Sequence, residues 1–371
     1  MTLRSQIRRV TVDRVDLPLT EPFGISGGGH AIAKNVLVTI ELGDGTLGYG
    51  EAAPLPPFNG ETQDLALDAL HRATPLLEGA DVRQWRSVAR SVRQATVGVG
   101  SAQCAIETAV VDAFARQAGV PLWAFFGGSS FRLDTDFTIP INSIDPATAV
   151  AHAARSARDI AARGFRVIKT KVGGSSATLD LNRLEAIHEA APGLAIILDA
   201  NGGFDAPTAL AFLDDLQRRN IVPLLFEQPV AKADLDGMAV VTARSGIPII
   251  ADESADGLAA VVELIKRRAA TGVNIKLMKC GIIEALDIAT LCRAAGFELM
   301  IGGMVESILA MSVSACFAAG IGGFTYADLD TPLFVAENPF RGGFQITGCE
   351  IDVRSIEAGH GVEPKAALVT R

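Results

Sequence analysis

The sequence predicts an α/β protein, a modified TIM barrel of the (β/α)7β type preceded by a smaller α+β domain. The 371 residues are 49% hydrophobic and 20% charged, which is enough apolar material for two domains with sizeable cores. Residues 1–53 are β-rich, and helical periodicity follows them. From about residue 134, short apolar runs alternate with amphipathic segments, as expected of βα units.

An α+β domain is predicted for residues 1–130. Its strand-like runs are residues 9–17, 35–42 and 46–51, and its helical segments are residues 61–78, 80–96 and 101–119. A glycine-rich loop at residues 22–30 separates the first two strands. It contains a G-x-S-x-G pattern centred on Ser26, which resembles a nucleophile elbow. Because a strand rather than a helix follows, we interpret Ser26 as a chance match.

Residues 131–332 are predicted to form the barrel. Its strands are the apolar runs 136–142, 165–172, 195–201, 224–228, 248–253, 274–279, 298–302 and 325–330. Helical segments fill the gaps, so eight strands and seven helices fit a (β/α)7β barrel. A doubly wound open sheet is the alternative, which we rank lower because no G-x-G-x-x-G pattern follows a strand. Residues 333–371 return to β and turn character, and we expect them to pack back on the N-terminal domain.

Charge and composition argue against several classes of protein. The net charge of −9 argues against a nucleic acid or an anionic membrane as partner. No apolar run has transmembrane length, and the N-terminus lacks the apolar core of a signal peptide. The five cysteines are scattered without C-x-x-C spacing, so we expect reduced thiols in a cytoplasmic protein. The five histidines are equally dispersed, which argues against a histidine-based zinc site.

Acidic residues follow three successive strands of the predicted barrel, at the edge where such barrels have their active sites. Asp199 stands in LDAN, Glu227 in FEQP and Asp252 in ADES. Each could have a structural role alone, for example Asp199 as a helix N-cap. Together, three carboxylates at one mouth repel one another unless a hard divalent cation lies between them. An all-oxygen ligand set favours Mg²⁺, with Mn²⁺ as the alternative.

Two lysines stand on the strand predicted at residues 165–172. Side chains alternate along a strand, so Lys169 and Lys171 point to the same side. In an apolar setting, two neighbouring ammonium groups each favour losing a proton, which would make Lys171 a base near neutral pH. The alternative is an edge strand with two solvated lysines. Lys276 lies four strands further round the barrel and faces the mouth from the opposite side, an arrangement that suits inversion at an α-carbon.

The order and spacing of five motifs resemble the muconate-lactonising subgroup of the enolase superfamily over essentially the whole chain. The motifs are KTK at 169–171, DAN at 199–201, EQP at 227–229, DES at 252–254 and NIKLMK at 274–279. The resemblance implies a capping N-terminal domain and one Mg²⁺ per subunit, with the metal ligands Asp199, Glu227 and Asp252. It also implies that Lys171 and Lys276 are the acid/base pair and that Lys169 contacts the substrate carboxylate.

Two further motifs resemble the dipeptide epimerases of that subgroup. Asp328 and Asp330 are separated by one residue on the last strand, so both point the same way. The resemblance implies that they hold the α-ammonium group of a substrate. GGMVES at 302–307 is similar as well, and it implies a substrate contact by Met304.

The capping loop departs from the glutamate-specific members of that group. Those enzymes carry an arginine where Gly28 stands in this sequence. Without that cation, an uncharged and apolar or bulky second side chain is favoured. Glu51 and Glu61 leave a basic second side chain open, although Glu51 also has a structural interpretation.

The sequence therefore predicts a Mg²⁺-dependent epimerase that inverts the α-carbon of the C-terminal residue of an L,L-dipeptide. Two lysines would transfer the proton through an enediolate, and the enzyme would be a homo-oligomer. The alternatives within the superfamily are an N-acylamino-acid racemase, an o-succinylbenzoate synthase or a cycloisomerase. Outside it, Lys171 could form a Schiff base in an aldolase, or the chain could be a catalytically inactive binding protein.

Overall fold

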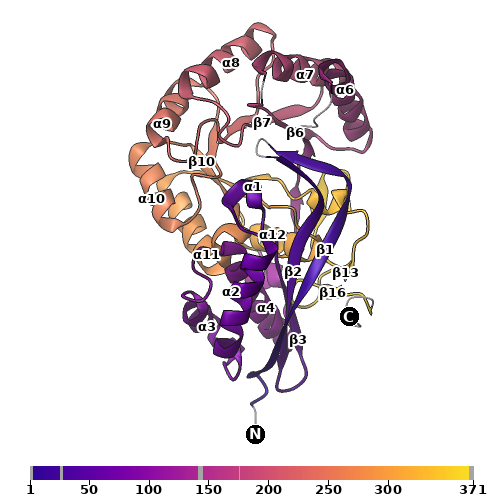
Figure 1. The fold of residues 1–371 in the computed structure, drawn as a ribbon, viewed down its shortest axis with the longest axis vertical. Helices are drawn as coiled ribbons and strands as arrows, with labels where there is room; N and C mark the ends of the chain where they lie inside the picture. Colours follow the sequence, from indigo (N-terminus) through magenta and orange to yellow (C-terminus); the bar gives the residue numbers. More distant parts are fainter. Residues whose placement is uncertain (1–2, 26–27, 141–144, 175, 367–371) are drawn as a thin grey trace.

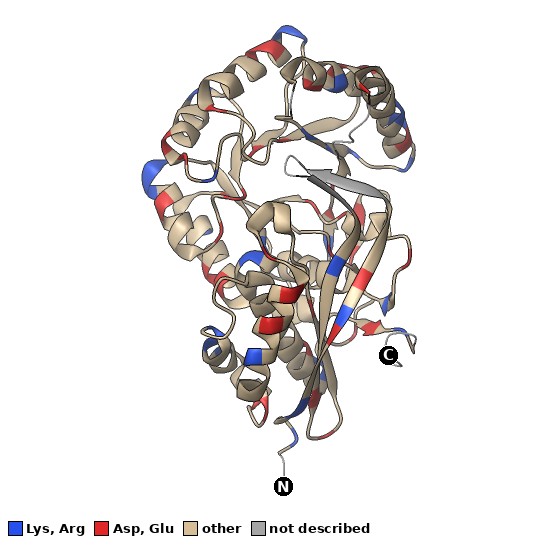
Figure 2. Ribbon diagram, viewed as in Figure 1, with Lys and Arg blue, Asp and Glu red and all other residues tan. Residues whose placement is uncertain are grey.

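A computed structural model describes residues 3–25, 28–140, 145–174 and 176–366, with only the backbone described for the parts of 21–30 inside these ranges (Figure 1). A barrel forms one half of the molecule, and the N-terminal domain packs beside its mouth. Figure 2 shows acidic and basic residues interspersed along the outer helices of the barrel. Within the described ranges, no helix has both the length and the apolar character needed to cross a membrane.

The N-terminal domain contains an antiparallel sheet in the order β1 (Ile7–Ile25), β2 (Gly28–Leu42) and β3 (Leu47–Ala52). The expectation of a glycine-rich loop at residues 22–30 is wrong for most of that range. The backbone continues as a hairpin in which Ile25 pairs with Gly28, because cross-strand hydrogen bonds can form whatever the side chains are. Ser26, interpreted above as a chance match, lies outside the described residues.

Helices α2 (Gln63–Leu77) and α4 (Gly100–Ala118) pack on this sheet. The domain also contains α1 (Pro56–Asn59), α3 (Trp85–Val92) and α5 (Leu122–Phe125). The single helix predicted at residues 80–96 is shorter in the structure, because the Asp81 side chain accepts the Arg83 N–H and starts a 3-10 turn, η1 (Val82–Gln84), before α3. The buried helix α4 packs directly on β3.

The barrel prediction is confirmed. Eight parallel strands follow one another in sequence order: β5 (Phe137–Ile139), β6 (Val167–Lys171), β7 (Ala195–Asp199), β8 (Leu225–Glu227), β9 (Ile249–Ala251), β10 (Gly272–Lys276), β11 (Glu298–Gly302) and β12 (Phe324–Ala327). The first and last strands meet at a seam, where the Asp136 N–H donates to the Ala327 carbonyl at 3.0 Å. The doubly wound alternative is therefore wrong, because its strand order would reverse near the middle of the sheet.

One helix follows each of the first seven barrel strands. These helices are α6 (Pro146–Ala162), α7 (Ala177–Ala190), α8 (Ala206–Arg218), α9 (Leu235–Arg244), α10 (Leu258–Arg267), α11 (Leu277–Ala295) and α12 (Ile308–Ile321). The strand predicted at residues 274–279 is wrong at its end, because β10 stops at Lys276. Lys279 therefore lies in the first turn of α11, which is interrupted at Gly281, where φ is 81°.

The C-terminal segment packs back on the N-terminal domain, as expected. After η2 (Thr331–Phe334), it forms β13 (Phe340–Gly342), β14 (Gln345–Thr347), β15 (Glu350–Asp352) and β16 (Val362–Pro364); β15 pairs with β4 (Arg132–Asp134). The Asp112 carboxylate on α4 accepts the backbone N–H of His360 at 2.9 Å. Arg116, one turn further along α4, donates to the Val362 carbonyl at 2.7 Å. The domain boundaries at residues 130 and 332 stay predictions.

Candidate active site

The three strand-end carboxylates converge because their strands are neighbours in register. Asp199 and Glu227 are the last residues of β7 and β8 and lie opposite each other in the ladder. Asp252 follows β9 directly. All three are fully buried, so none is the exposed surface charge that a single residue could have been. Asp199 Oδ1 also accepts the Asn201 N–H at 3.0 Å.

The lysines stand among these carboxylates. Lys169 Nζ lies 2.6 Å from Asp328 Oδ2, 2.7 Å from Glu227 Oε2 and 3.1 Å from Asp199 Oδ2. Lys171 Nζ lies 2.5 Å from the same Asp199 oxygen. Lys169 and Lys171 are only 1% and 6% exposed, which excludes the solvated edge strand.

Lys276 approaches from another part of the barrel. It ends β10, which three strands separate from β6 in the sheet order. Its Nζ lies 2.7 Å from Asp252 Oδ2 and 4.7 Å from the centroid of the Phe58 ring, which α1 of the N-terminal domain places over it. Lys276 is 5% exposed. Lys171 and Lys276 thus contact different strand-end carboxylates, Asp199 and Asp252 respectively.

Carboxylates rather than neighbouring lysines control the charge of Lys169 and Lys276. Burial alone would lower the pKa of Lys169, but the charges of Asp328, Glu227 and Asp199 outweigh it and raise the pKa well above its usual value. Burial is likewise outweighed at Lys276, whose pKa is raised chiefly by Asp252 and Glu227. The expectation that each lysine of the KTK pair favours losing its proton is therefore wrong for Lys169, because more carboxylates than lysines surround it.

Glu227 differs from the two aspartates beside it. Burial and then the charge of Asp199 raise the pKa of Glu227 to about 7. In contrast, Lys276 and Lys279 overcome the effect of burial on Asp252 and lower its pKa to about 2. Within the described part of the chain, Glu227 Oε2 has no hydrogen-bond donor and only the ion pair with Lys169.

The donor set fits a hard cation. Asp199, Glu227 and Asp252 offer only oxygen, and Glu227 Oε2 has no hydrogen-bond donor among the described residues, which suits a divalent metal ion. The tightest carboxylate group in the described residues is a different one, Asp136, Asp328 and Asp330, whose oxygens lie within 4.8 Å of one another.

The prediction that Asp328 and Asp330 stand on the last strand is wrong, because β12 ends at Ala327 and the chain turns into η2 after Asp330. Both carboxylates nevertheless come together with Lys169 at the seam of the barrel. Lys169 lowers the pKa of Asp328 despite its burial. Asp330 Oδ2 accepts the Thr138 N–H at 2.6 Å, and burial followed by the charge of Asp328 raises the pKa of Asp330 to about 7. The two carboxylates face one site, but one of them already shares its charge with a lysine.

Sequence reasoning missed several residues that hold this site. Asn274 Nδ2 donates to Glu227 Oε1 at 2.8 Å, and Lys279 Nζ donates to Asp252 Oδ1 at 3.0 Å. Both belong to NIKLMK, and the polar residue two positions before Lys276 was a usable signal for Asn274. Glu306 is buried in GGMVES, and its Oε1 accepts the Met304 N–H at 2.8 Å. Asp136 is the fourth residue that sequence reasoning missed. The only sequence signal for it was its place at the start of the strand predicted at residues 136–142.

Met304 and Gly28 have different outcomes. Met304 is 3% exposed and packs in the main hydrophobic core. Gly28 is the first residue of β2, and only its backbone lies within the described part of the structure. The substrate contacts expected of both stay predictions.

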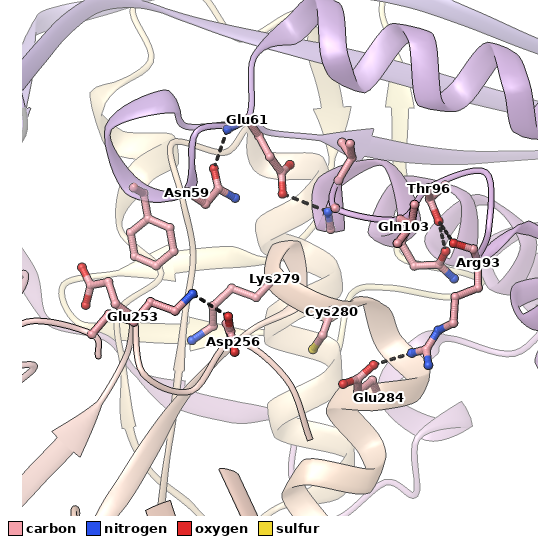
Figure 3. A pocket seen from close by; sticks show the side chains of 16 residues that line it. Asn59, Glu61, Arg93, Thr96, Gln103, Glu253, Asp256, Lys279, Cys280 and Glu284 are labelled. Carbon is pink, nitrogen blue, oxygen red and sulfur yellow. Dashed lines mark hydrogen bonds and ion pairs between the residues drawn. The ribbon is translucent and has the colours of Figure 1, made fainter. Parts of the chain in front are cut away.

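Glu51 and Glu61 serve the fold. Glu51 accepts the Ser307 N–H at 3.0 Å and the Asn35 side chain at 2.7 Å. Glu61 accepts the Gly100 N–H at 2.9 Å and so caps α4 (Figure 3). Because both carboxylates are used by these donors, they do not favour a basic substrate side chain.

A cavity of about 450 Å³ lies between the N-terminal domain and the barrel (Figure 3). Phe58 and Asn59 line it from the N-terminal domain, and Glu253 and Lys279 line it from the barrel. The three candidate site lysines do not line this cavity. The Phe58 ring connects the cavity with Lys276, whose Nζ lies 4.7 Å from the ring centroid.

Fold and site together define a class of protein: a capped (β/α)7β barrel with lysines and carboxylates at the strand ends. Residues 7–127 match the N-terminal domain of mandelate racemase / muconate lactonizing enzymes, and residues 152–368 match the enolase C-terminal domain-like family. The chain belongs to this branch of the enolase superfamily, which confirms the resemblance.

Three relatives span nearly the full chain. An aromatic dipeptide epimerase from Herpetosiphon aurantiacus is 49% identical and covers 96% of this chain and 98% of its own. A hydrophobic dipeptide epimerase from Citrifermentans bemidjiense is 38% identical over 98% of this chain and 100% of its own. The dipeptide epimerase of Enterococcus faecalis V583, solved with Mg and the dipeptide L-Leu-L-Tyr, has 31% identity and a TM-score of 0.90 over 96% of this chain and 99% of its own.

Proposed function

We propose that the protein is an isomerase, a Mg²⁺-dependent dipeptide epimerase that inverts the α-carbon of the C-terminal residue. The observation that carries the proposal is the pair Lys171 and Lys276, buried on different strands and each ion-paired to a different strand-end carboxylate. Relatives named dipeptide epimerases, from 49% identity downward, support the reaction class. Inversion of configuration at an α-carbon by proton transfer needs a proton acceptor on one face and a proton donor on the other, which a pair of lysines can supply.

The residues take the following roles in the proposal. Asp199, Glu227 and Asp252 hold Mg²⁺, or Mn²⁺ as the alternative. A bound divalent cation supplies a Lewis acid for the substrate carboxylate and stabilises the negative charge of the enediolate. Lys169 hydrogen-bonds the same carboxylate. Lys171 takes the α-proton from one epimer while Lys276 delivers a proton to the other face, and the roles exchange in reverse.

Asp328 and Asp330 bind the α-ammonium group of the dipeptide. Their charge is only partly used by Lys169, and their position at the seam faces the lysines. The second side chain of the substrate is apolar or aromatic in this proposal. The aromatic ring of Phe58 beside Lys276 supports that preference, as do the names of the two relatives.

The test is a library of L,L-dipeptides incubated in D₂O with Mg²⁺ and analysed by mass spectrometry. We expect one deuterium in the C-terminal residue, with the strongest signal from apolar and aromatic residues. Lys171→Ala should abolish exchange from one epimer and Lys276→Ala exchange from the other. Lys266→Ala, which changes an exposed lysine on the outer helix α10, is the control. Equal residual exchange from both epimers in both active-site variants would contradict the two-lysine mechanism.

The alternatives in the superfamily give a different pattern. An N-acylamino-acid racemase, an o-succinylbenzoate synthase or a cycloisomerase has a substrate without an ammonium group. Asp330→Asn would then leave turnover nearly unchanged, whereas the proposal expects a higher KM for dipeptides. Trapping of the substrate on Lys171 by borohydride would instead indicate a Schiff-base aldolase.

Location and assembly are part of the proposal. All five cysteines are free and buried, which is consistent with a reducing compartment such as the cytoplasm. A homo-oligomer stays a prediction, and sedimentation velocity at several protein concentrations tests it.

A further inference from the structure

Three carboxylates gather beneath the candidate ammonium site. Asp136 precedes β5, and Asp328 and Asp330 follow β12, so the closure of the barrel seam brings together residues from its first and last strands. One oxygen of each lies within 4.8 Å of the others. Asp136 is 2% exposed and Asp330 is fully buried.

The hydrogen bonds of this cluster are incomplete. Asp328 Oδ2 pairs with Lys169, and Asp330 Oδ2 accepts the Thr138 N–H at 2.6 Å. Across the described ranges, neither oxygen of Asp136 has a hydrogen-bond partner, and neither has Asp330 Oδ1. A buried carboxylate without a donor is strongly disfavoured. Among the described residues, only Lys169 is ion-paired with this cluster, through Asp328, and two further carboxylates share the same ammonium group.

A proton on one member removes both problems. A protonated carboxyl group donates one O–H. An oxygen of Asp330 lies within 4.8 Å of an oxygen of Asp136, and Asp330 Oδ1 is an acceptor without a donor in the described ranges. The cluster then carries two negative charges, which match Lys169 and one incoming ammonium group. The charged groups that face Asp136 are Asp328, Lys169, Asp330 and Glu227.

We propose that Asp136 is a positioning residue, a buried carboxylic acid whose O–H donates to Asp330 Oδ1 and fixes the Asp328–Asp330 pair for a substrate ammonium group. Asp328 and Asp330 each accept one donor, whereas neither oxygen of Asp136 has a partner in the described ranges, so Asp136 is the member that gains most from a proton. Burial, followed by the charge of Asp328, raises the pKa of Asp136 well above its usual value, which agrees with this assignment. The role rests on the proposed epimerase function, but the protonation state does not.

Two substitutions separate a neutral donor from a charged ligand. Asp136→Asn keeps the size and provides an NH₂ donor group, and Asp136→Leu removes the donor with a similar volume. We expect Asp136→Leu to raise KM for the dipeptide about 10- to 100-fold, with a smaller change in kcat, and Asp136→Asn to raise KM much less. Equal increases of KM in both variants would overturn the proposal, because an ionised Asp136 would then act by its charge.

Infrared spectroscopy tests the protonation state without a substrate. The spectrum of wild type minus that of Asp136→Asn should contain the C=O stretch of a protonated carboxyl group, unchanged between about pH 6 and 8. A carboxylate band from Asp136 in place of the C=O stretch would overturn the proposal. So would a spectrum that changes when Na⁺ or K⁺ replaces choline as the cation of the buffer, because the cluster would then bind a metal cation instead of a proton. Failure of the wild type to epimerise any dipeptide would contradict the proposed function instead, and the infrared result would still decide the state of Asp136.

Discussion

At the scale of single residues, hydrogen-bond donors orient the carboxylates of the site. Lys279 is the clearest case, because its Nζ contacts Asp252 Oδ1 at 3.0 Å, the Asp252 carbonyl at 2.8 Å and the Asn274 carbonyl at 2.8 Å. It therefore fixes both the backbone and one oxygen of Asp252, and leaves Oδ2 directed toward Lys276. Lys279 has the position of an orienting partner of Asp252, which we propose as a metal ligand.

Substitution of Lys279 tests this role through metal affinity. Loss of one positive charge would by itself tighten cation binding, whereas loss of orientation weakens it. We expect orientation to dominate, so Lys279→Met should weaken Mg²⁺ binding about 10- to 100-fold. Isothermal titration calorimetry without substrate measures it, with Lys232→Met, an exposed lysine, as the control. Unchanged or tighter binding in Lys279→Met would show that the contact has no orienting role.

Residue types at strand ends were predictable, and their pairing was not. The positions of Asp199, Glu227 and Asp252 follow from local runs of apolar residues that end in an acid. Which lysine each acid neutralises depends on strand order and side-chain reach. The pKa expectation for Lys169 failed for this reason, because the charge of Asp328 reaches it across 159 residues of sequence.

At the scale of elements, the contact between β3 and α4 depends on small residues. A Cβ atom added at Gly50 would lie 1.9 Å from the backbone oxygen of Ala105, and one at Gly48 would lie 2.3 Å from that of Ala109. The strand and the helix therefore approach more closely than any side chain would allow. This packing holds the sheet of the N-terminal domain against its central helix.

Gly50→Ala tests this close approach. The backbone of α4 must move away from β3, so we expect the free energy of unfolding to fall by about 3 kcal/mol. Gly193→Ala is the control, because its Cβ would have no heavy atom within 4 Å; it should change stability by less than about 1 kcal/mol. Urea denaturation measures both. Similar values for the two variants would indicate that the contact is adaptable.

Element types were mostly predictable, and some boundaries were not. The run NIKLMK is compatible with a strand throughout, yet the strand ends at Lys276 and a helix begins. Contacts of Lys279 with two carbonyl groups decide the change of direction, and no local preference encodes them. The long hairpin of β1 and β2 was missed in the same way, because pairing with the opposite strand outweighs the flexibility of glycine.

At the scale of the whole molecule, buried carboxylates join the two domains and control the response to pH. Glu51 from β3 accepts the N–H of Ser307 at the start of the barrel helix α12, and Glu107 from α4 accepts the N–H of Ile283 on α11 at 2.9 Å. Deeper in the barrel, burial raises the pKa of Glu306 to about 8, and the charge of Glu51 adds to the effect. Unfolding releases these groups to water together.

The sign of the pH dependence follows from proton counts. Between the ordinary pKa of 4.5 and about 8, the folded protein holds the proton of Glu306 and the unfolded chain has lost it. Stability therefore falls as pH rises through this range, by up to about 1.4 kcal/mol per pH unit from this group. Glu306→Gln should lack this contribution in chelator-treated protein, measured by urea denaturation between about pH 5 and 9. The exposed Glu357→Gln is the control, and a slope unchanged by Glu306→Gln would refute the assignment.

The sequence by itself determined the superfamily, the capped barrel and the identity of the lysines and carboxylates at the strand ends. Each of these depends on the type and order of residues within short segments, where strand ends bring polar groups to one mouth. Only the tertiary structure decided that Asp136 joins Asp328 and Asp330, that Lys279 holds Asp252, and that carboxylates rather than lysines set the charge of Lys169. The physical reason is that these effects act through space, between residues that closure of the barrel brings together.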